Sequence, residues 1–210
     1  MSTSRRDFLN WVGVSSALAA TASFAKTEAL AAQQAKPAEG SKWDMSWTDR
    51  VNGKYKAVFD GPSMSEGGAM FRACIWRDQH KDVYGTERKD ASAVLVLRHA
   101  AIELIMNDKY WDRFEVGKTE KWKDSKGKKW IKTNPIGSAD PAMTGAFKEY
   151  NLADFMKSGG IVLACNMAFS SVIANYRKKD KLSQADGTKA AKEDIIPGII
   201  LQPSGIFAAL

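Results

Sequence analysis

Two residues combine reactive side chains with surroundings that suit chemistry. Cys165 ends the apolar run 161–165 and precedes a segment of helical composition. Backbone N–H groups at the start of a helix favour a thiolate, and a thiolate can attack a sulfane sulfur and carry it as a persulfide. His99 follows the apolar run 91–97 and is a candidate general base for that thiol. The same residues also fit a structural interpretation, in which Cys165 packs as a small apolar side chain and His99 bonds to loop carbonyls.

Other side chains near these segments have simpler explanations. Arg98 either holds an anion or is a solvated strand end. Cys74 shares one face of an expected helix with Met70, Ala73 and Arg77, which favours core packing over chemistry. A bridge between the two cysteines would remove any thiol function, but a helix face and a strand end seldom have the geometry that a disulfide requires.

The composition excludes several classes of protein. With 210 residues, 44% of them hydrophobic and 26% charged, the chain fits one globular domain. Two cysteines exclude a disulfide-rich scaffold, and two histidines argue against a multi-histidine metal site. The sequence contains no Gly-x-Ser-x-Gly elbow, no phosphate-binding glycine loop and no His-Glu-x-x-His motif. We therefore expect no cofactor and no resident metal, and the net charge of +7 by itself identifies no partner.

Residues 1–31 have the features of an export signal. Paired arginines, Arg5 and Arg6, precede a weakly apolar stretch, and small residues suitable for cleavage follow. This pattern is typical of a twin-arginine signal, so we expect passage through the twin-arginine translocase, a periplasmic location and no stable membrane span after cleavage. The alternative is an amphipathic helix that stays attached as a membrane anchor. Residues 32–50 have the composition of a linker to a domain over 51–210.

From residue 55 onward, segments typical of strands alternate with segments typical of helices. The expected strands are 55–60, 91–97, 161–165 and 195–202, and the expected helices are 67–84, 100–114, 152–157, 171–176 and 206–210. This alternation predicts an α/β fold, a single domain with a mainly parallel sheet and helices on both faces. Ligands of such folds bind beyond the carboxyl ends of the strands. The loops expected to converge there are 60–64, 98–100 and 165–167.

Residues 115–145 interrupt the alternation with an insert rich in lysine and tryptophan. Seven lysines gather within it, together with Trp122 and Trp130. A turn at 124–127 predicts a β-hairpin with both tryptophans near its base. Such a segment suits phosphate contact and base stacking, or it is a solvated loop whose tryptophans cover the sheet edge or a neighbouring subunit. Because the expected location is the periplasm, we expect no nucleic acid partner.

Three segments together resemble the DsrE/DsrF-like sulfur-transfer family. They are the cysteine-containing strand and turn at 159–168, the strand and histidine at 97–105, and the last strand and turn at 195–205. The resemblance implies a flavodoxin-like domain that assembles into homo-oligomers, and in some members a cysteine persulfide within a relay of small proteins. The position that matches the family's cysteine is Cys165, and His99 matches the histidine after its second strand. The chain departs from the pattern at Asn166, where the family has a glycine-type turn.

These observations lead to one preferred function and two alternatives. We expect an exported sulfur carrier or weak transferase in which Cys165 accepts sulfane sulfur and His99 assists, which leaves open whether the protein is an enzyme. Arg98, Asn166 and Ser204 are the expected contacts to an anionic donor such as thiosulfate, and a sulfur-relay protein is the expected partner. The first alternative is a non-catalytic oligomeric module that binds a ligand or partner at the strand ends. The second is a heme or metal carrier that uses His99 with Cys165 or a methionine.

Overall fold

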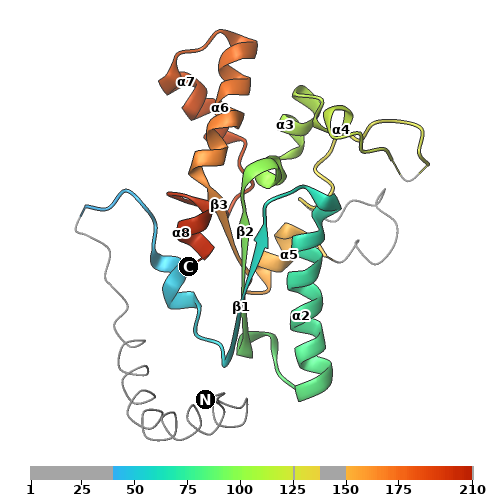
Figure 1. Ribbon diagram of the computed structural model, residues 1–210, viewed down its shortest axis with the longest axis vertical. Helices are drawn as coiled ribbons and strands as arrows, with labels where there is room; N and C mark the ends of the chain where they lie inside the picture. Colours follow the sequence, from blue (N-terminus) through green and yellow to red (C-terminus); the bar gives the residue numbers. More distant parts are fainter. Residues whose placement is uncertain (1–39, 125, 138–149, 210) are drawn as a thin grey trace, which may run out of the picture. The chain divides into compact units, whose positions relative to one another are not determined.

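The computed structural model describes residues 40–209, except Ser125 and 138–149. The chain divides into two units, Met1–Ser41 and Lys42–Leu210, and the fold described below is that of the second unit (Figure 1). The expected leader, 1–31, lies outside the described residues, so export stays a prediction. In the described part of the chain, no helix combines the length and the apolar character needed to cross a membrane.

The unit is an α/β domain built on a four-stranded, all-parallel sheet in the order β1-β2-β3-β4. The strands are β1 (Tyr55–Gly61), β2 (Ala91–Leu97), β3 (Ile161–Cys165) and β4 (Ile200–Gln202). Each strand pairs with the next one along the chain, and the register places Gly61 beside Leu97, Leu97 beside Ala164, and Cys165 beside Gln202. The expected fold class is confirmed, and the carboxyl ends of all four strands meet at one edge, which we call the carboxyl edge.

Helical segments fill the connections between the strands. The α-helices are α2 (Gly68–Tyr84), α3 (Asp108–Arg113), α4 (Val116–Thr119), α5 (Leu152–Lys157), α6 (Asn166–Asp180), α7 (Gln184–Glu193) and α8 (Gly205–Ala209). The 3-10 helices are η1 (Ser46–Arg50), η2 (Ser65–Gly67), η3 (Arg88–Asp90) and η4 (His99–Ile105).

The sheet has two apolar faces of different extent. Side chains alternate along β2, so Ala93, Leu95 and Leu97 join the main core with residues of α2, η4, α5 and α6. Val94 and Val96 point the other way and pack with Ala208 of α8. Consecutive parallel strands joined by right-handed connections place their helices on one face, which accounts for the larger core. In Figure 1, α2 and α5 lie on one side of the sheet and α8 on the other.

The second face is covered by short elements from the two ends of the domain. Trp47 of η1 and Val51 pack there beside α8. The Arg50 guanidinium donates to Gly160 O (3.2 Å), and the Gln202 amide donates to Asp44 O (2.8 Å). The later part of the segment expected to be a linker, 32–50, therefore packs on the domain. On β1 the same face is more open, since Val58 is half exposed.

Two connections differ from their expected structure. The strand expected over 195–202 begins only at Ile200, because Pro197 has no N–H to donate and Gly198 adopts a φ of +93°. The helix expected over 100–114 divides into the 3-10 helix η4 and α3. Four of the seven residues of η4 are buried apolar side chains, and this wide apolar surface suits a segment packed on several sides better than an amphipathic helix.

The insert contains the expected hairpin. Lys123 and Trp130 form an antiparallel bridge, and Ile131 N donates to Trp122 O (3.0 Å). The Trp122 ring stacks on Trp111 of the main core, with 5.8 Å between ring centroids. Asn134 ties the end of the hairpin to η4, since its side-chain amide donates to Leu104 O and Met106 O (2.7 Å each).

Candidate functional site

Cys165 lies at the carboxyl edge, where β3 ends and α6 begins. Its Sγ accepts a hydrogen bond from Ala168 N (3.4 Å), so the sulfur occupies the position of a helix cap. The free N–H groups and dipole of a 15-residue helix favour negative charge there. Both cysteines are free, and Cys165 is only 5% exposed. The start of α6 therefore directs a backbone donor at the sulfur, while access from solvent is narrow.

Arg98 lies beside this sulfur and is held in place by Asp60. The guanidinium donates from Nε and from a terminal nitrogen to the two carboxylate oxygens (2.7 and 2.6 Å). These hydrogen bonds lower the pKa of Asp60 and raise the pKa of Arg98, and the nearby Cys165 sulfur adds to the second effect. Gly205 packs directly against the Arg98 side chain, since a Cβ there would lie 2.5 Å from Arg98 Cδ. Arg98 thus places a guanidinium group in a fixed position at the carboxyl edge, with Asp60 as its counter-charge.

His99 opens η4 in a backbone conformation that is uncommon for a residue with a side chain. Its φ is +51°, in the left-handed region. The side chain is exposed, and His99 follows Arg98 among the groups that lower the pKa of Asp60. Within the described residues, no hydrogen bond joins His99 to Cys165. His99 therefore shares the edge with Cys165 without a hydrogen bond to it.

The two other expected contact residues also lie at this edge. Asn166 is the first residue of α6 and is partly buried. Ser204 lies between β4 and α8, where its Oγ accepts from Phe207 N (3.1 Å). That hydrogen bond caps α8, so the Ser204 hydroxyl has a structural task whether or not it meets a ligand.

The structure adds two residues to the expected site. Asp60 is the partner of Arg98, and only the β1–β2 register brings their side chains together. Gln202 is fully buried and pairs with Cys165 in the register of β3 and β4. Its Oε1 has no hydrogen-bond partner among the described residues. The sequence signal for Gln202 was a glutamine at the end of an apolar strand. Such a residue is noteworthy because burying a side-chain amide costs free energy unless the amide is hydrogen-bonded.

The thiol of Cys74 has a different environment from that of Cys165. It is buried on α2, and its thiol donates to Met70 Sδ (3.5 Å). Burial, with Asp78 nearby, raises the pKa of Cys74 to about 11. The expected core role of Cys74 is confirmed.

The hairpin forms one wall of a separate groove. A cavity of about 620 Å³ lies between the hairpin and α3–α4. Its lining includes Trp111, Trp130, Lys118, Lys128, Lys129 and Lys132. Lys118 pairs with Glu115 (3.4 Å) and Lys132 with Asp112 (2.9 Å), so half of these lysines are neutralised locally.

The described residues contain no group of three or more histidine, cysteine, aspartate or glutamate side chains arranged to hold a metal ion. Comparisons with protein-family models, with curated proteins and with solved structures found no match to the chain. The resemblance to the DsrE/DsrF-like family therefore rests on the three sequence segments given above.

Proposed function

We propose that the protein is an exported, DsrE/DsrF-like sulfur carrier that accepts sulfane sulfur on Cys165. The observation that carries the proposal is the position of Cys165 Sγ, which caps α6 through Ala168 N and lies near the Arg98 guanidinium that Asp60 holds in place. Helix N–H groups and an arginine stabilise both a thiolate and the persulfide anion that replaces it. The leader supports export, and the three matching segments support the family.

The proposed reaction needs one proton transfer and one displacement. His99, or water at the exposed edge beside it, takes the proton of the Cys165 thiol. The thiolate then attacks the outer sulfur of thiosulfate, a new S–S bond forms, and the old S–S bond breaks with its electron pair leaving on sulfite. Arg98 attracts the dianionic donor and, because Asp60 holds it, keeps its position through the reaction. A thiolate of the relay partner removes the outer sulfur in the same manner and restores Cys165.

The test is intact-mass analysis of the mature protein after incubation with thiosulfate or polysulfide. We expect the mass of one sulfur atom to be added to the parent chain and to a Cys74→Ser variant. The Cys165→Ser variant should gain nothing. Treatment with a thiol reductant should remove the added sulfur. A Cys165→Ser variant that gains as much sulfur as the parent would refute the proposal.

A second candidate function, a non-catalytic oligomeric binding module, is favoured by other observations. Cys165 is buried, whereas three large apolar side chains near the carboxyl edge and on α8 are exposed: Met167, Ile206 and Phe207. Exposed apolar side chains of this size are typical of contacts with another protein. In that case the parent chain would gain no sulfur in the mass experiment, and Cys165→Ser would assemble as the parent does.

A further inference from the structure

Arg77 carries a buried positive charge, and the described residues give it no negative partner. Its side chain on α2 is 2% exposed, and its guanidinium donates to the hydroxyl and the carbonyl of Ser158. Among the described residues, the buried Nε atom has no hydrogen-bond partner and no carboxylate forms an ion pair with Arg77. A charge removed from water is costly unless an opposite charge compensates it. A bound anion near Arg77 would therefore stabilise the folded protein.

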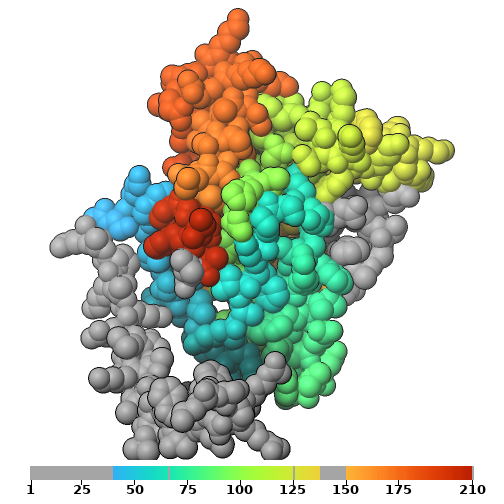
Figure 2. All heavy atoms as spheres, in the orientation of Figure 1, coloured from blue at the N-terminus to red at the C-terminus, as the bar shows by residue number. Residues whose placement is uncertain are grey.

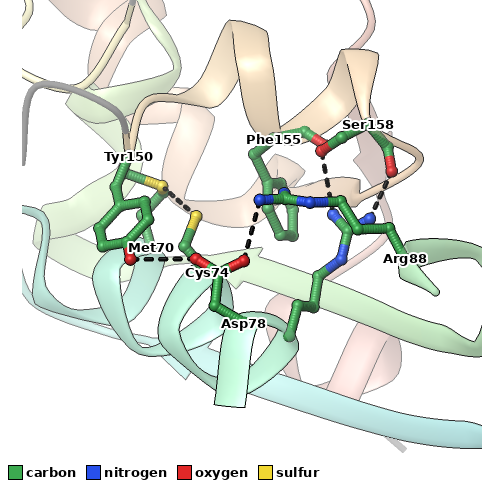
Figure 3. Close-up of polar contacts among 8 residues, drawn as sticks. Met70, Cys74, Asp78, Arg88, Tyr150, Phe155 and Ser158 are labelled. Carbon is green, nitrogen blue, oxygen red and sulfur yellow. Dashed lines mark hydrogen bonds and ion pairs between the residues drawn. The ribbon is translucent and has the colours of Figure 1, made fainter. Parts of the chain in front are cut away.

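A cavity of about 430 Å³ lies directly beyond Arg77, between α2 and α5. Phe155 and Ser158 line it, and both touch Arg77, since the guanidinium lies over the Phe155 ring (5.6 Å to the centroid) and bonds to Ser158. Arg88 and Lys157 also contribute to the lining. Figure 3 shows the Arg88 side chain reaching toward Asp78, to which its guanidinium donates. Two cationic side chains thus line the cavity, and Arg77 contacts two of its lining residues from behind.

The two carboxylates that line the cavity already have partners. Asp78 accepts from Arg88 (2.9 Å) and from the Tyr150 hydroxyl (3.0 Å), as Figure 3 shows. Asp154 accepts from the side-chain amide of Asn151 (2.8 Å). Arg77 and Lys157, in contrast, have no ion pair with a carboxylate in the described part of the chain. Arg77, Lys157 and Asp154 are thus the charged side chains at the cavity without an ion pair among the described residues. Their net charge is positive, which favours an anionic ligand over a cationic one.

Arg77 and Arg88 also act on one another. Burial, and after it the charge of Arg88, lowers the pKa of Arg77. Two neighbouring guanidinium groups repel each other. A bound anion between or beside them would be attracted to both and would offset that repulsion. Planar guanidinium groups and a lysine ammonium are the side chains that most often hold phosphate and sulfate.

We propose that this cavity binds a small tetrahedral oxyanion of the phosphate and sulfate class through Arg88 and Lys157, with the buried charge of Arg77 behind the lining residues Phe155 and Ser158. The site is separate from the Cys165 edge. Ser158 precedes the first residue of β3, whereas Cys165 is its last residue, so the two lie at opposite ends of a strand roughly 15 Å long. The proposal does not depend on the sulfur chemistry of Cys165.

The test uses inorganic phosphate and sulfate as probes on the mature protein, with sodium chloride at equal ionic strength as the reference. We expect isothermal titration to show one anion per chain. We also expect thermal unfolding to shift upward with anion concentration, because a ligand that binds only the folded state stabilises it. The Lys157→Gln and Arg88→Gln variants should each weaken binding by about tenfold, which is typical for loss of one charge-assisted hydrogen bond.

Lys128→Gln is the matched control, because it removes one lysine from the hairpin groove and leaves this cavity intact. Its affinity should equal that of the parent chain. Lys157 is exposed, so Lys157→Gln should fold as the parent does. It therefore keeps the assay valid where a substitution of the buried Arg77, such as Arg77→Met, prevents folding. The proposal is overturned if the parent chain binds neither anion. It is also overturned if Lys157→Gln and Arg88→Gln bind as the parent does, in which case Arg77 serves only to cap α5 through Ser158.

Discussion

At the scale of single residues, the same thiol group has two different environments in this domain. Cys74 is surrounded by core side chains of α2, and burial raises its pKa to about 11. Cys165 is also buried, but its sulfur accepts a backbone N–H at the start of α6 and lies near Arg98. Burial alone therefore does not separate a structural cysteine from a candidate nucleophile, whereas the polar groups directed at the sulfur do.

The Arg98–Asp60 pair should contribute modestly and in a pH-dependent way to stability. Its hydrogen bonds lower the pKa of Asp60 below the ordinary value of about 3.9. The contribution is therefore present above that value and is lost as the pH falls through the lower, folded-state pKa. Because the Asp60 side chain is 40% exposed, we expect Asp60→Asn to reduce the free energy of unfolding by only about 0.5–1 kcal/mol at pH 7.

Urea unfolding of the parent and Asp60→Asn at several pH values measures this difference. The two stability curves should converge below about pH 4. A gap that stays constant down to pH 2.5 would show that the substitution acts through packing, independently of the carboxylate charge.

Sequence reasoning at this scale was partly successful. Cys165, His99 and Arg98 could be placed at one edge, because parallel strands share their carboxyl ends. The Arg98–Asp60 pair could not, since it depends on the β1–β2 register. Arg77 was placed on the apolar face of its helix, but only the position of Ser158 shows that the guanidinium is buried without a counter-charge.

At the scale of elements, β1, β2, β3 and α5 were predictable to within a residue because apolar runs and glycine turns mark their ends. The strand expected over 195–202 is longer than the observed β4, because the apolar residues of 195–199 pack on the core without joining the sheet. Ile195 instead forms an antiparallel bridge with Met106, and Ile196 N donates to Ile105 O (2.9 Å). Apolar composition reports burial, and it does not distinguish a strand from a packed connection.

Asn134 should be one of the most important polar side chains for stability. It is buried, donates to two carbonyls near η4 and accepts from Ile136 N (3.1 Å). Asn134→Ala leaves these backbone groups without a partner, so we expect the free energy of unfolding to fall by about 2–4 kcal/mol. Lys132→Ala removes an exposed ion pair two residues away and should cost much less than Asn134→Ala. Urea unfolding with equal losses for the two variants would contradict this role.

At the scale of the whole domain, the two ends of the sheet have different chemistry. The carboxyl edge holds Cys165, Arg98 and His99. The opposite end holds the cavity between α2 and α5, with Arg77 behind its lining. The second face carries α8, whose atoms are visible in red in Figure 2. Ile206 and Phe207 on this helix are 69% and 49% exposed. Such side chains are unfavourable in water unless another surface covers them.

We therefore expect the mature chain to form homo-oligomers through α8. Sedimentation analysis should show a mass larger than one chain, and Ile206→Glu or Phe207→Glu should shift it to the monomer with little change in circular dichroism. Val83→Glu is the control, because Val83 is also 69% exposed but lies at the end of α2 on the other side of the sheet. A parent chain that stays monomeric at all concentrations would contradict the expectation.

The most direct test of the Cys165 assignment is the rate at which each thiol of the folded, mature protein is alkylated at pH 7. Intact mass followed by peptide mapping identifies which cysteine reacts, and Cys74→Ser and Cys165→Ser verify each rate separately. The account predicts that Cys165 reacts much faster than Cys74, because the raised pKa of the Cys74 thiol, about 11, keeps it protonated at pH 7. If Cys165 resists alkylation until the protein unfolds, or is found bridged to Cys74, it carries no sulfur and the binding module becomes the better account.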